Sequence, residues 1–261
     1  MSAITGDDYL HFCEGLRKLS GIDLTQYKRP QMERRLRTFL QRRGFPSLSD
    51  SLPRLRADRE ELDALLDRMT INVSQLWRNP EHWQILQNKI VPELGKSGKF
   101  AAWSAGSSYG AEAYTLAAIS RQALPDASIH ILGTDIDRRM VDRATRGEFT
   151  LDDARTAPPE AMKRWFEQSE NGWRARTELR EITRFEVGDL LRVNPPRGRF
   201  NLIMCRNTVI YFEEPIRDEL HSRLASALAP GGYLMVGATE RVANPSLLGL
   251  QPAHPFIFRK A

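Results

Sequence analysis

The chain has 261 residues, of which 41% are hydrophobic and 27% charged, and its net charge is +5. This length and composition predict a soluble globular protein with one large domain, or with one domain and a smaller one. No apolar run approaches the roughly 20 residues that a membrane span needs, and the acidic N-terminus does not resemble a secretory signal. Two distant cysteines and five scattered histidines favour neither disulfides nor a metal site, so we expect a cytoplasmic protein without bound metal.

Residues 1–70 are expected to form a helical N-terminal domain. The first helix carries apolar residues at helical spacing and ends at Gly21: Tyr9, Phe12, Leu16 and Leu19. The next helix has Pro30 in its first turn and ends at Gly44, two positions that suit these residue types. A further helical pair follows, up to Met69.

The second of these helices is strongly basic. Residues 28–43 contain seven basic residues and one acid, a net charge of +6 that exceeds the charge of the whole chain. A charge run is most often a solvated helix face, but this concentration favours a docking surface for an acidic partner.

Residues 71–89 are expected to be a linker that packs against the domains instead of moving freely. Its first part mixes apolar residues such as Leu76 and Trp77 with polar ones such as Ser74 and Arg78, and a helix over residues 82–94 follows.

From Phe100 onward, strands alternate with helices. Phe100 to Trp103 reads as a buried strand, residues 104–110 as a turn of small residues, and the following stretch as a helix. Further buried strands are expected at residues 128–134, 200–205 and 233–237, with a last strand at 255–260. Residues 148–170 read as irregular or helical, and an insertion at about 172–185 as short antiparallel strands, the last of which enters the main sheet as ITRFEVGDL. The expected class is therefore α/β, with a doubly wound, mostly parallel sheet over residues 90–261.

In such a sheet, ligands bind beyond the carboxyl ends of the strands. Four stretches meet there: the glycine turn with Gly106, then Asp135, then Asp189 with Leu190, and last Arg206 with Asn207 and Thr208. An acid after the second strand commonly binds ribose hydroxyls, although Asp135 could merely cap the next helix. Asp189 could meet an adenine amino group or stabilise a turn. The spacing G-x-x-x-G is not the dinucleotide pattern G-x-G-x-x-G, so an oxidoreductase fits poorly.

The stretch FNLIMCRNTVIYFEEPIRDELHSRLASALAPGGYLMVGATE resembles the CheR-type chemoreceptor methyltransferases, whose core block reads C-R-N, an apolar pair, I-Y-F, a helix and P-G-G-Y-L. The resemblance extends over residues 7–258, through the linker, WSAGSSYGAEAYTLA, GTDID and the basic helical domain. It implies an S-adenosylmethionine-dependent methyltransferase that esterifies glutamate carboxylates of methyl-accepting chemoreceptors in chemotaxis, with S-adenosylhomocysteine as product. Nothing in the sequence indicates oligomerisation, so we expect a monomer that acts neither on nucleic acid nor within a membrane.

By position in these motifs, the resemblance assigns the site residues. The donor would be bound by residues of the linker, the glycine turn and the strand ends: Asn72, Ser74, Arg78, Gly106, Glu112, Asp135, Asp189, Leu190, Asn207 and Thr208. Arg78 and Tyr211 would face the methyl group and the substrate. The receptor helix would dock on the basic helix: Arg34, Arg35, Arg37, Arg42 and Arg43.

The chain departs from the family pattern at several of these positions. Ser74, Leu76 and Trp77 replace a Thr and a Phe pair in the linker, and Asp189 replaces an Asn. The usual turn C-S-T-G-E-E-P differs here at four positions and keeps only its second acid, Glu112: Ser107, Tyr109, Ala111 and Ala113.

Two alternatives stay open. A non-catalytic module could bind the donor or its product and dock on receptors, because the glycine turn is altered. A nucleic-acid methyltransferase would also suit the basic charge, and Asn194-Pro195-Pro196 resembles the start of an amino-methylating motif. However, Arg197 stands where that motif needs an aromatic residue for base stacking.

Overall fold

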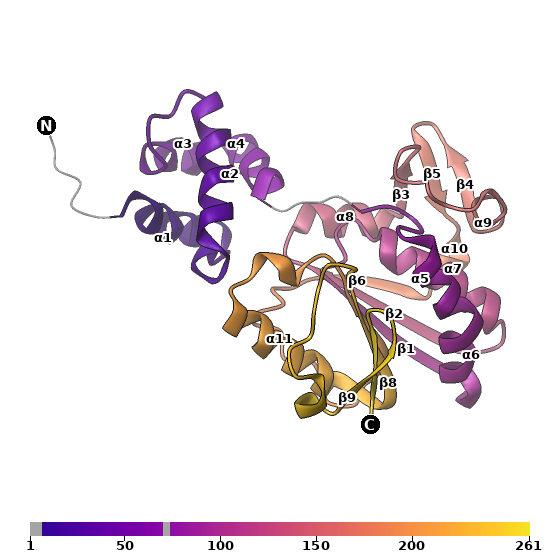
Figure 1. Cartoon of the computed structure of the whole chain (residues 1–261). Coiled ribbons are helices and arrows are strands. Elements are labelled where there is room, and N and C mark those ends of the chain that lie inside the picture. Colours follow the sequence, from indigo (N-terminus) through magenta and orange to yellow (C-terminus); the bar gives the residue numbers. More distant parts are fainter. Residues whose placement is uncertain (1–6, 70–73) are drawn as a thin grey trace, which may run out of the picture. The chain divides into compact units, whose positions relative to one another are not determined.

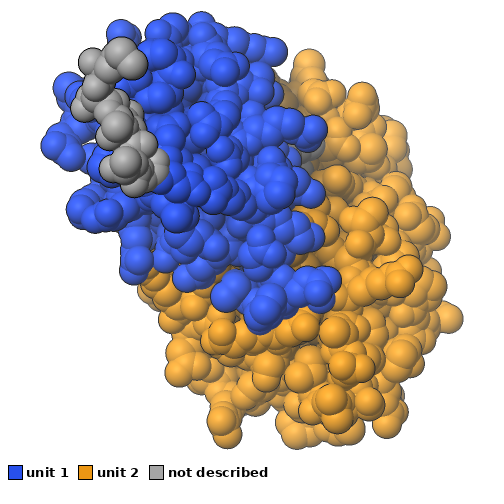
Figure 2. Space-filling model, turned by 60° about the vertical axis from the view of Figure 1, so that its left-hand side comes forward, with its two compact units in different colours: residues 1–72, 211–217 blue, residues 73–210, 218–261 orange. Residues whose placement is uncertain are grey.

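The computed structural model describes residues 7–69 and 74–261 (Figure 1). The chain divides into two compact units, coloured separately in Figure 2. The helical unit comprises residues 1–72 and 211–217, and the sheet unit comprises residues 73–210 and 218–261. No helix in the described part of the chain is both long and apolar enough to cross a lipid bilayer.

Residues 7–69 of the helical unit form four α-helices and two short 3₁₀ turns: α1 (Asp8–Ser20), η1 (Leu24–Gln26), α2 (Arg29–Arg42), η2 (Ser49–Ser51), α3 (Leu52–Ala57) and α4 (Arg59–Met69). The apolar stripes expected for the first two helices are buried, Phe12 and Leu16 on α1 and Met32, Leu36 and Leu40 on α2. The all-helical N-terminal part is therefore confirmed.

A later segment of the chain also belongs to this unit. Tyr27 forms a β-bridge with Phe212, and their rings meet edge to face at 4.9 Å between centroids. The amide of Lys28 donates to the carbonyl oxygen of Tyr211 at 2.9 Å. Residues 211–217 are thus attached to the start of α2.

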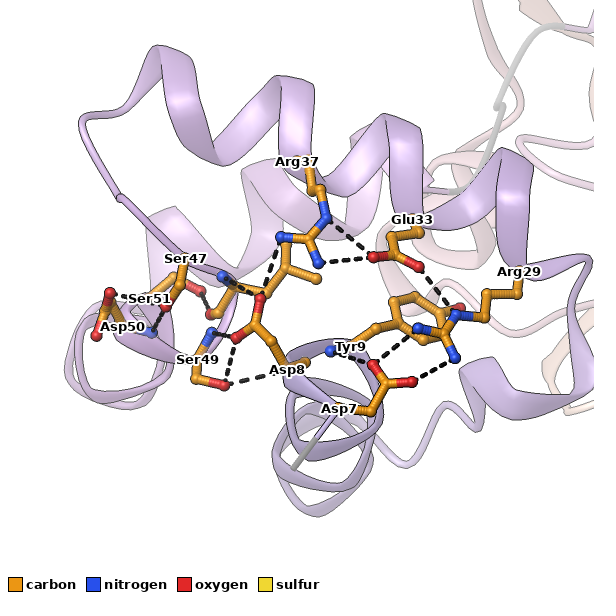
Figure 3. Close-up of polar contacts among 11 residues, drawn as sticks. Asp7, Asp8, Tyr9, Arg29, Glu33, Arg37, Ser47, Ser49, Asp50 and Ser51 are labelled. Atoms are coloured by element: carbon orange, nitrogen blue, oxygen red, sulfur yellow. Dashed lines mark hydrogen bonds and ion pairs between the residues drawn. The ribbon is translucent and has the colours of Figure 1, made fainter. Parts of the chain in front are cut away.

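Asp8 joins three parts of the helical unit (Figure 3). Its carboxylate accepts hydrogen bonds from the amides of Leu48 (3.2 Å) and Ser49 (3.0 Å) and from the Ser49 hydroxyl (2.7 Å). Arg37 of α2 pairs with the same carboxylate at 3.1 Å. Burial alone would raise the pKa of Asp8, but the hydrogen bonds from Ser49, Leu48 and Arg37 outweigh it and lower the pKa.

The sheet unit is built on seven strands in the order β6-β2-β1-β7-β8-β10-β9. Their bounds are β1 Lys99–Ala105, β2 Ser128–Asp135, β6 Thr183–Val187, β7 Phe200–Cys205, β8 Leu228–Val236, β9 Leu250–His254 and β10 Ile257–Lys260. The first five of these run parallel, and the β9–β10 hairpin closes one edge antiparallel. The predicted doubly wound, mostly parallel sheet is confirmed.

Helices cover both faces of this sheet (Figure 1). The helical elements are α5 (Pro80–Ile85), a π-helical turn (Leu86–Ile90), α6 (Val91–Leu94), η4 (Gly95–Ser97), α7 (Ala111–Ala123), α8 (Arg138–Arg146), α9 (Pro159–Trp165), α10 (Thr177–Arg180), η5 (Val209–Tyr211), α11 (Glu214–Ala227) and η6 (Pro245–Leu248). Trp83, Leu86 and Leu116 belong to one buried cluster with strand residues such as Ile131 and Leu202. This core fixes the strand ends that carry the candidate site.

A second, three-stranded antiparallel sheet lies in the same unit, in the order β3-β5-β4. Its strands are β3 (Glu148–Thr150), β4 (Phe166–Ser169) and β5 (Gly172–Ala175). The small antiparallel subdomain is confirmed, but it spans residues 148–175 and overlaps the expected insertion at about 172–185 only in β5. Residues 148–170, expected to be irregular or helical, contribute two of its strands. Residues 177–180 form α10, and β6 enters the main sheet as expected, where it pairs in parallel with β2.

Replacing Asp8 by Ala tests the contribution of its contacts with Leu48, Ser49 and Arg37 to the stability of the helical unit. We expect the thermal unfolding midpoint at pH 7 to fall, because about 1–3 kcal/mol of charge-assisted hydrogen bonding is lost. Since the native pKa of Asp8 lies below its usual value, its contribution is present above pH about 4 and is lost as the pH falls through the native pKa. The two proteins should therefore converge in acid when unfolding is followed by circular dichroism at 222 nm.

Asp126→Ala, in an exposed loop of the sheet unit, serves as the matched control. An Asp8→Ala midpoint equal to that of the control at pH 7 would contradict the assigned role.

Candidate functional site

The glycine turn lies where the order of the strands reverses. From β1 the chain moves to β2 and β6 on one side, then returns to β7 on the other side, so the ends of β1 and β7 border the crevice in which such folds bind ligands. Gly106 and Gly110 have φ values of 80° and 84°, in the left-handed region that favours glycine. A methyl group placed on Gly106 would lie 2.5 Å from Thr208 Oγ1, so the turn and the loop after β7 are in close contact.

Asp135 ends β2 beside this turn. The amide of Ser108 donates to its Oδ2 at 2.7 Å, and the amide of Asp137 donates to its Oδ1 at 3.0 Å. Each oxygen keeps a lone pair that could accept a hydroxyl proton. Burial raises the pKa of Asp135, against the effect of these amide hydrogen bonds. The cap of helix α8 is Asp137, whose side chain accepts from the Arg139 amide, so capping that helix does not occupy Asp135.

Asp189 acts within a turn in this structure. Its Oδ1 accepts from the amide of Leu191 at 2.9 Å, and its Oδ2 lies 3.4 Å from the Arg192 guanidinium. The preceding residue, Gly188, donates its amide to the carbonyl oxygen of Asp135 at 2.9 Å, which brings the end of β6 to the end of β2. Leu190 is buried.

Asn207 and Thr208 are held by a residue that the sequence analysis did not single out, Glu240. Its carboxylate accepts four backbone hydrogen bonds, from the amides of Asn207 (2.9 Å), Thr208 (2.9 Å), Val209 (3.0 Å) and Gly237 (2.6 Å). Asn207 adopts φ 58°, in the left-handed region. Glu240 is only 4% exposed, so these bonds are shielded from water and fix the loop after β7.

Glu112, in the first turn of α7, is paired within the protein. Its Oε1 accepts from the Ser104 hydroxyl at 2.8 Å, and its Oε2 lies 3.3 Å from the Arg206 guanidinium. Burial raises the pKa of Glu112, and Arg206 and Ser104 oppose that effect. The expected donor contact of Glu112 would therefore have to share a carboxylate that already has two partners.

Arg206 also reaches the linker. It donates to the carbonyl oxygen of Arg78 at 3.2 Å and to Asn79 Oδ1 at 3.1 Å, and its guanidinium lies over the Trp83 ring at 5.5 Å. The Trp83 indole donates to the same Arg78 carbonyl at 2.9 Å. The backbone of Arg78 is thus fixed beside the glycine turn.

Ser74, another linker residue assigned to the donor, contacts the glycine turn through its backbone. The carbonyl oxygen of Ser74 accepts a hydrogen bond from the hydroxyl of Tyr109 in the glycine turn. Asn72 lies outside the described residues.

Tyr211 and the basic residues belong to the helical unit. The Arg35 guanidinium lies over the Tyr211 ring at 5.2 Å. Among the five arginines expected to dock a partner, Arg37 pairs with Glu33 (2.6 Å) and Asp8, and Arg43 pairs with Glu61 (2.5 Å). Arg34 and Arg42 are exposed and form no ion pair with any described residue.

The groups at the strand ends fit S-adenosylmethionine. The Ser107 hydroxyl is buried and has no partner in the described part of the chain. The first amides of α7 have no side-chain cap, and the Asp135 oxygens retain lone pairs for ribose hydroxyls. A nucleoside with a polar tail needs this combination of acceptors, free amides and close glycine backbone.

Glu240, which the sequence analysis did not single out, occupies the same kind of position as Arg206. Arg206 and Glu240 come shortly after the buried strands β7 and β8, as Asp135 comes at the end of β2. The sequence places Arg206 at the end of a buried strand, but it contains no sign that the partner of Arg206 is Glu112, 94 residues away.

Comparison with known proteins places this arrangement in a family. Residues 72–253 match the family described as CheR methyltransferase, SAM binding domain, and residues 7–70 match CheR methyltransferase, all-alpha domain. A chemotaxis protein methyltransferase of Listeria innocua is 31% identical over 97% of this chain and 97% of its own length. Chemotaxis protein methyltransferases 1 of Pseudomonas aeruginosa and of Vibrio cholerae are each 31% identical over 94% of this chain and 93% of theirs. The chain therefore belongs to the CheR methyltransferase family and is an S-adenosylmethionine-dependent methyltransferase.

Proposed function

We propose that this protein methylates glutamate side-chain carboxylates of methyl-accepting chemoreceptors and leaves glutamyl methyl esters. The observation that carries the proposal is the set of groups at the ends of β1, β2 and β7, which suits the methyl donor, in a chain whose full-length relatives are chemotaxis protein methyltransferases. The free, buried state of Cys13 and Cys205 suits a reducing cytoplasm, where we expect a monomer that acts on protein and not on nucleic acid.

S-adenosylmethionine supplies a methyl group bound to a positively charged sulfur. We propose that the ribose is held by Asp135 and that the methionine portion meets Asn207 and Thr208. Ser74, Arg78 and Gly106 would border the donor, as would Asn72. Asp189 and Leu190 would meet the adenine, with Asp189 using lone pairs that its turn leaves free. Glu112 would act through the shape of the turn that its ion pair with Arg206 maintains.

The acceptor needs no general base. A glutamate with an ordinary pKa of about 4.3 is ionised at neutral pH and carries its own nucleophilic oxygen. The protein must therefore align this carboxylate and exclude water. We assign the alignment to the Arg78 guanidinium. Tyr211 follows Thr208 by three residues, and we propose that it shapes the pocket for the methyl group.

The test of this function uses a methyl-labelled donor and the cytoplasmic fragment of a chemoreceptor. We expect label on the fragment that mild base releases as methanol, because carboxyl methyl esters are base-labile. Binding of S-adenosylhomocysteine without any label on receptor fragments would instead indicate a donor-binding module that has lost catalysis. Label that resists base would exclude carboxylate as the acceptor.

Glu240→Gln tests the loop after β7. The amide keeps one acceptor oxygen but turns an N–H₂ group toward two backbone amides, at a cost of about 1–3 kcal/mol for each unsatisfied group. We expect calorimetry to show at least tenfold weaker binding of S-adenosylhomocysteine, with the circular dichroism spectrum unchanged. Glu219→Gln, an exposed change on α11, should bind like the unaltered chain. Equal affinities for the two variants would refute the role of Glu240.

The ion pairs of the helical unit indicate which of its arginines are left to dock a receptor. Because Arg37 and Arg43 have acidic partners, we assign receptor docking chiefly to Arg34, Arg35 and Arg42. Arg35 and Arg42 are seven residues apart on α2, which puts them on one stripe.

Reversing the charge of this stripe in Arg35→Glu/Arg42→Glu should weaken receptor-fragment binding at least tenfold at low salt, and by less at high salt. Binding of S-adenosylhomocysteine should not change. The control is Arg56→Glu on α3, which is also exposed and basic. If that control weakened receptor binding as much, only general charge attraction would be at work.

A further inference from the structure

Asp153, in the loop after β3, is a meeting point of three segments of the sheet unit. Its Oδ2 accepts from the amide of Thr150 at 2.8 Å and pairs with the Arg143 guanidinium of α8. Its Oδ1 accepts from the hydroxyl of Tyr109 at 2.9 Å. The carboxylate therefore links the small sheet, helix α8 and the glycine turn, and none of these contacts involves a residue assigned to the donor.

The same loop holds the linker through its backbone. The carbonyl oxygen of Asp153 accepts from the amide of Leu76 at 2.9 Å, and the Thr156 hydroxyl donates to the carbonyl oxygen of Leu76 at 2.7 Å. The single hydroxyl proton of Tyr109 also faces the carbonyl oxygen of Ser74, so it is shared between that oxygen and Asp153 Oδ1. Residues 74–76 are thus attached at three points to groups outside the linker.

The contact between Tyr109 and Asp153 is partly buried. Tyr109 is 3% exposed, and the Arg143 guanidinium lies over its ring at 4.1 Å. The side chains of Arg143 and Asp153 are 26% and 13% exposed. Burial raises the pKa of Tyr109, and the charge of Asp153 adds to that effect, so the hydroxyl keeps its proton and remains a donor at neutral pH.

The linker depends on such contacts because residues 74–79 form no helix or strand. At its far end, the amide of Trp77 donates to Thr115 Oγ1 at 3.1 Å, and Arg206 and Trp83 hold the Arg78 carbonyl. Residues 74–76, at the start of the described part of the linker, are held by Asp153, Tyr109 and Thr156.

We propose that Asp153 and Tyr109 form a clamp that positions linker residues 74–78 at the donor site. Both are positioning residues, since they act through Ser74 and Leu76 and not on the donor itself. The proposal rests on the assignment of Ser74 and Arg78 to the donor site in the proposed function. It adds that the small sheet contributes to donor affinity through one carboxylate.

The experiment compares two adjacent aspartates in the full chain. Asp153→Asn removes the ion pair and turns an N–H₂ group toward one of the clamp's donors. Asp152→Asn makes the same change in charge at a neighbour whose side chain is 78% exposed. Tyr109→Phe removes only the hydroxyl group. This second variant allows the proposal to be tested even if Asp153→Asn does not fold.

Two readouts are taken for each variant. Hydrogen exchange without donor reports on the amides of residues 74–78, and calorimetry measures the affinity for S-adenosylhomocysteine. For Asp153→Asn and Tyr109→Phe we expect at least tenfold faster exchange in the linker and at least fivefold weaker binding. Asp152→Asn should match the unaltered chain, and the double variant should lose less than the two single losses combined, because both changes break one cluster.

The outcomes separate this proposal from the function on which it rests. If the unaltered chain shows a protected linker but binds no S-adenosylhomocysteine, the proposed function fails. If it binds, and Asp153→Asn and Tyr109→Phe behave like Asp152→Asn in both readouts, the clamp is refuted while the function stands. Faster exchange with unchanged affinity would also overturn the positioning role.

Discussion

The candidate site depends first on one buried cation, the Arg206 guanidinium. A buried charge is very costly unless it is paired and hydrogen-bonded, and Arg206 is only 8% exposed. Its partners are the Glu112 carboxylate and the oxygens of Arg78 and Asn79, which belong to the first turn of α7 and to the linker. Satisfying this one side chain therefore requires the end of β7, the glycine turn and the linker to meet. Removing Glu112 would leave the guanidinium buried without a counter-charge, which typically costs about 3–5 kcal/mol.

A second buried charged side chain, Glu240, accepts hydrogen bonds where Arg206 donates them. Four backbone amides converge on this carboxylate, so the loop that carries Asn207 and Thr208 is shaped around an acceptor contributed by the chain after β8. Asp135 likewise accepts two amides. The polar groups at the strand ends are thus oriented by the protein itself, and donor binding would require little reordering.

Much of the fold could be predicted because long apolar strands alternate with helices from Phe100 onward. A small antiparallel sheet was also predictable, but the strands that residues 148–150 and 166–169 contribute to it were not. β3 has only three residues and β4 exposes three of its four, so neither shows the pattern of a buried strand. Asp135 was predictable as a polar residue at the end of an apolar strand. The pairing of Glu112 with Arg206 was not, because partners far apart in the sequence leave no local signal. The same holds for Arg37 and Arg43, whose acidic partners a count of charges on one helix does not reveal.

The donor site is tested most directly by hydrogen exchange of the full chain with and without S-adenosylhomocysteine. The account predicts that the ligand slows exchange in four segments of the sheet unit: residues 74–78, 104–112, 133–137 and 206–210. Residues 8–69 of the helical unit should exchange at the same rate in both samples. Protection confined to the helical unit, or its absence from the glycine turn and the loop after β7 at saturating ligand, would contradict the donor site described above.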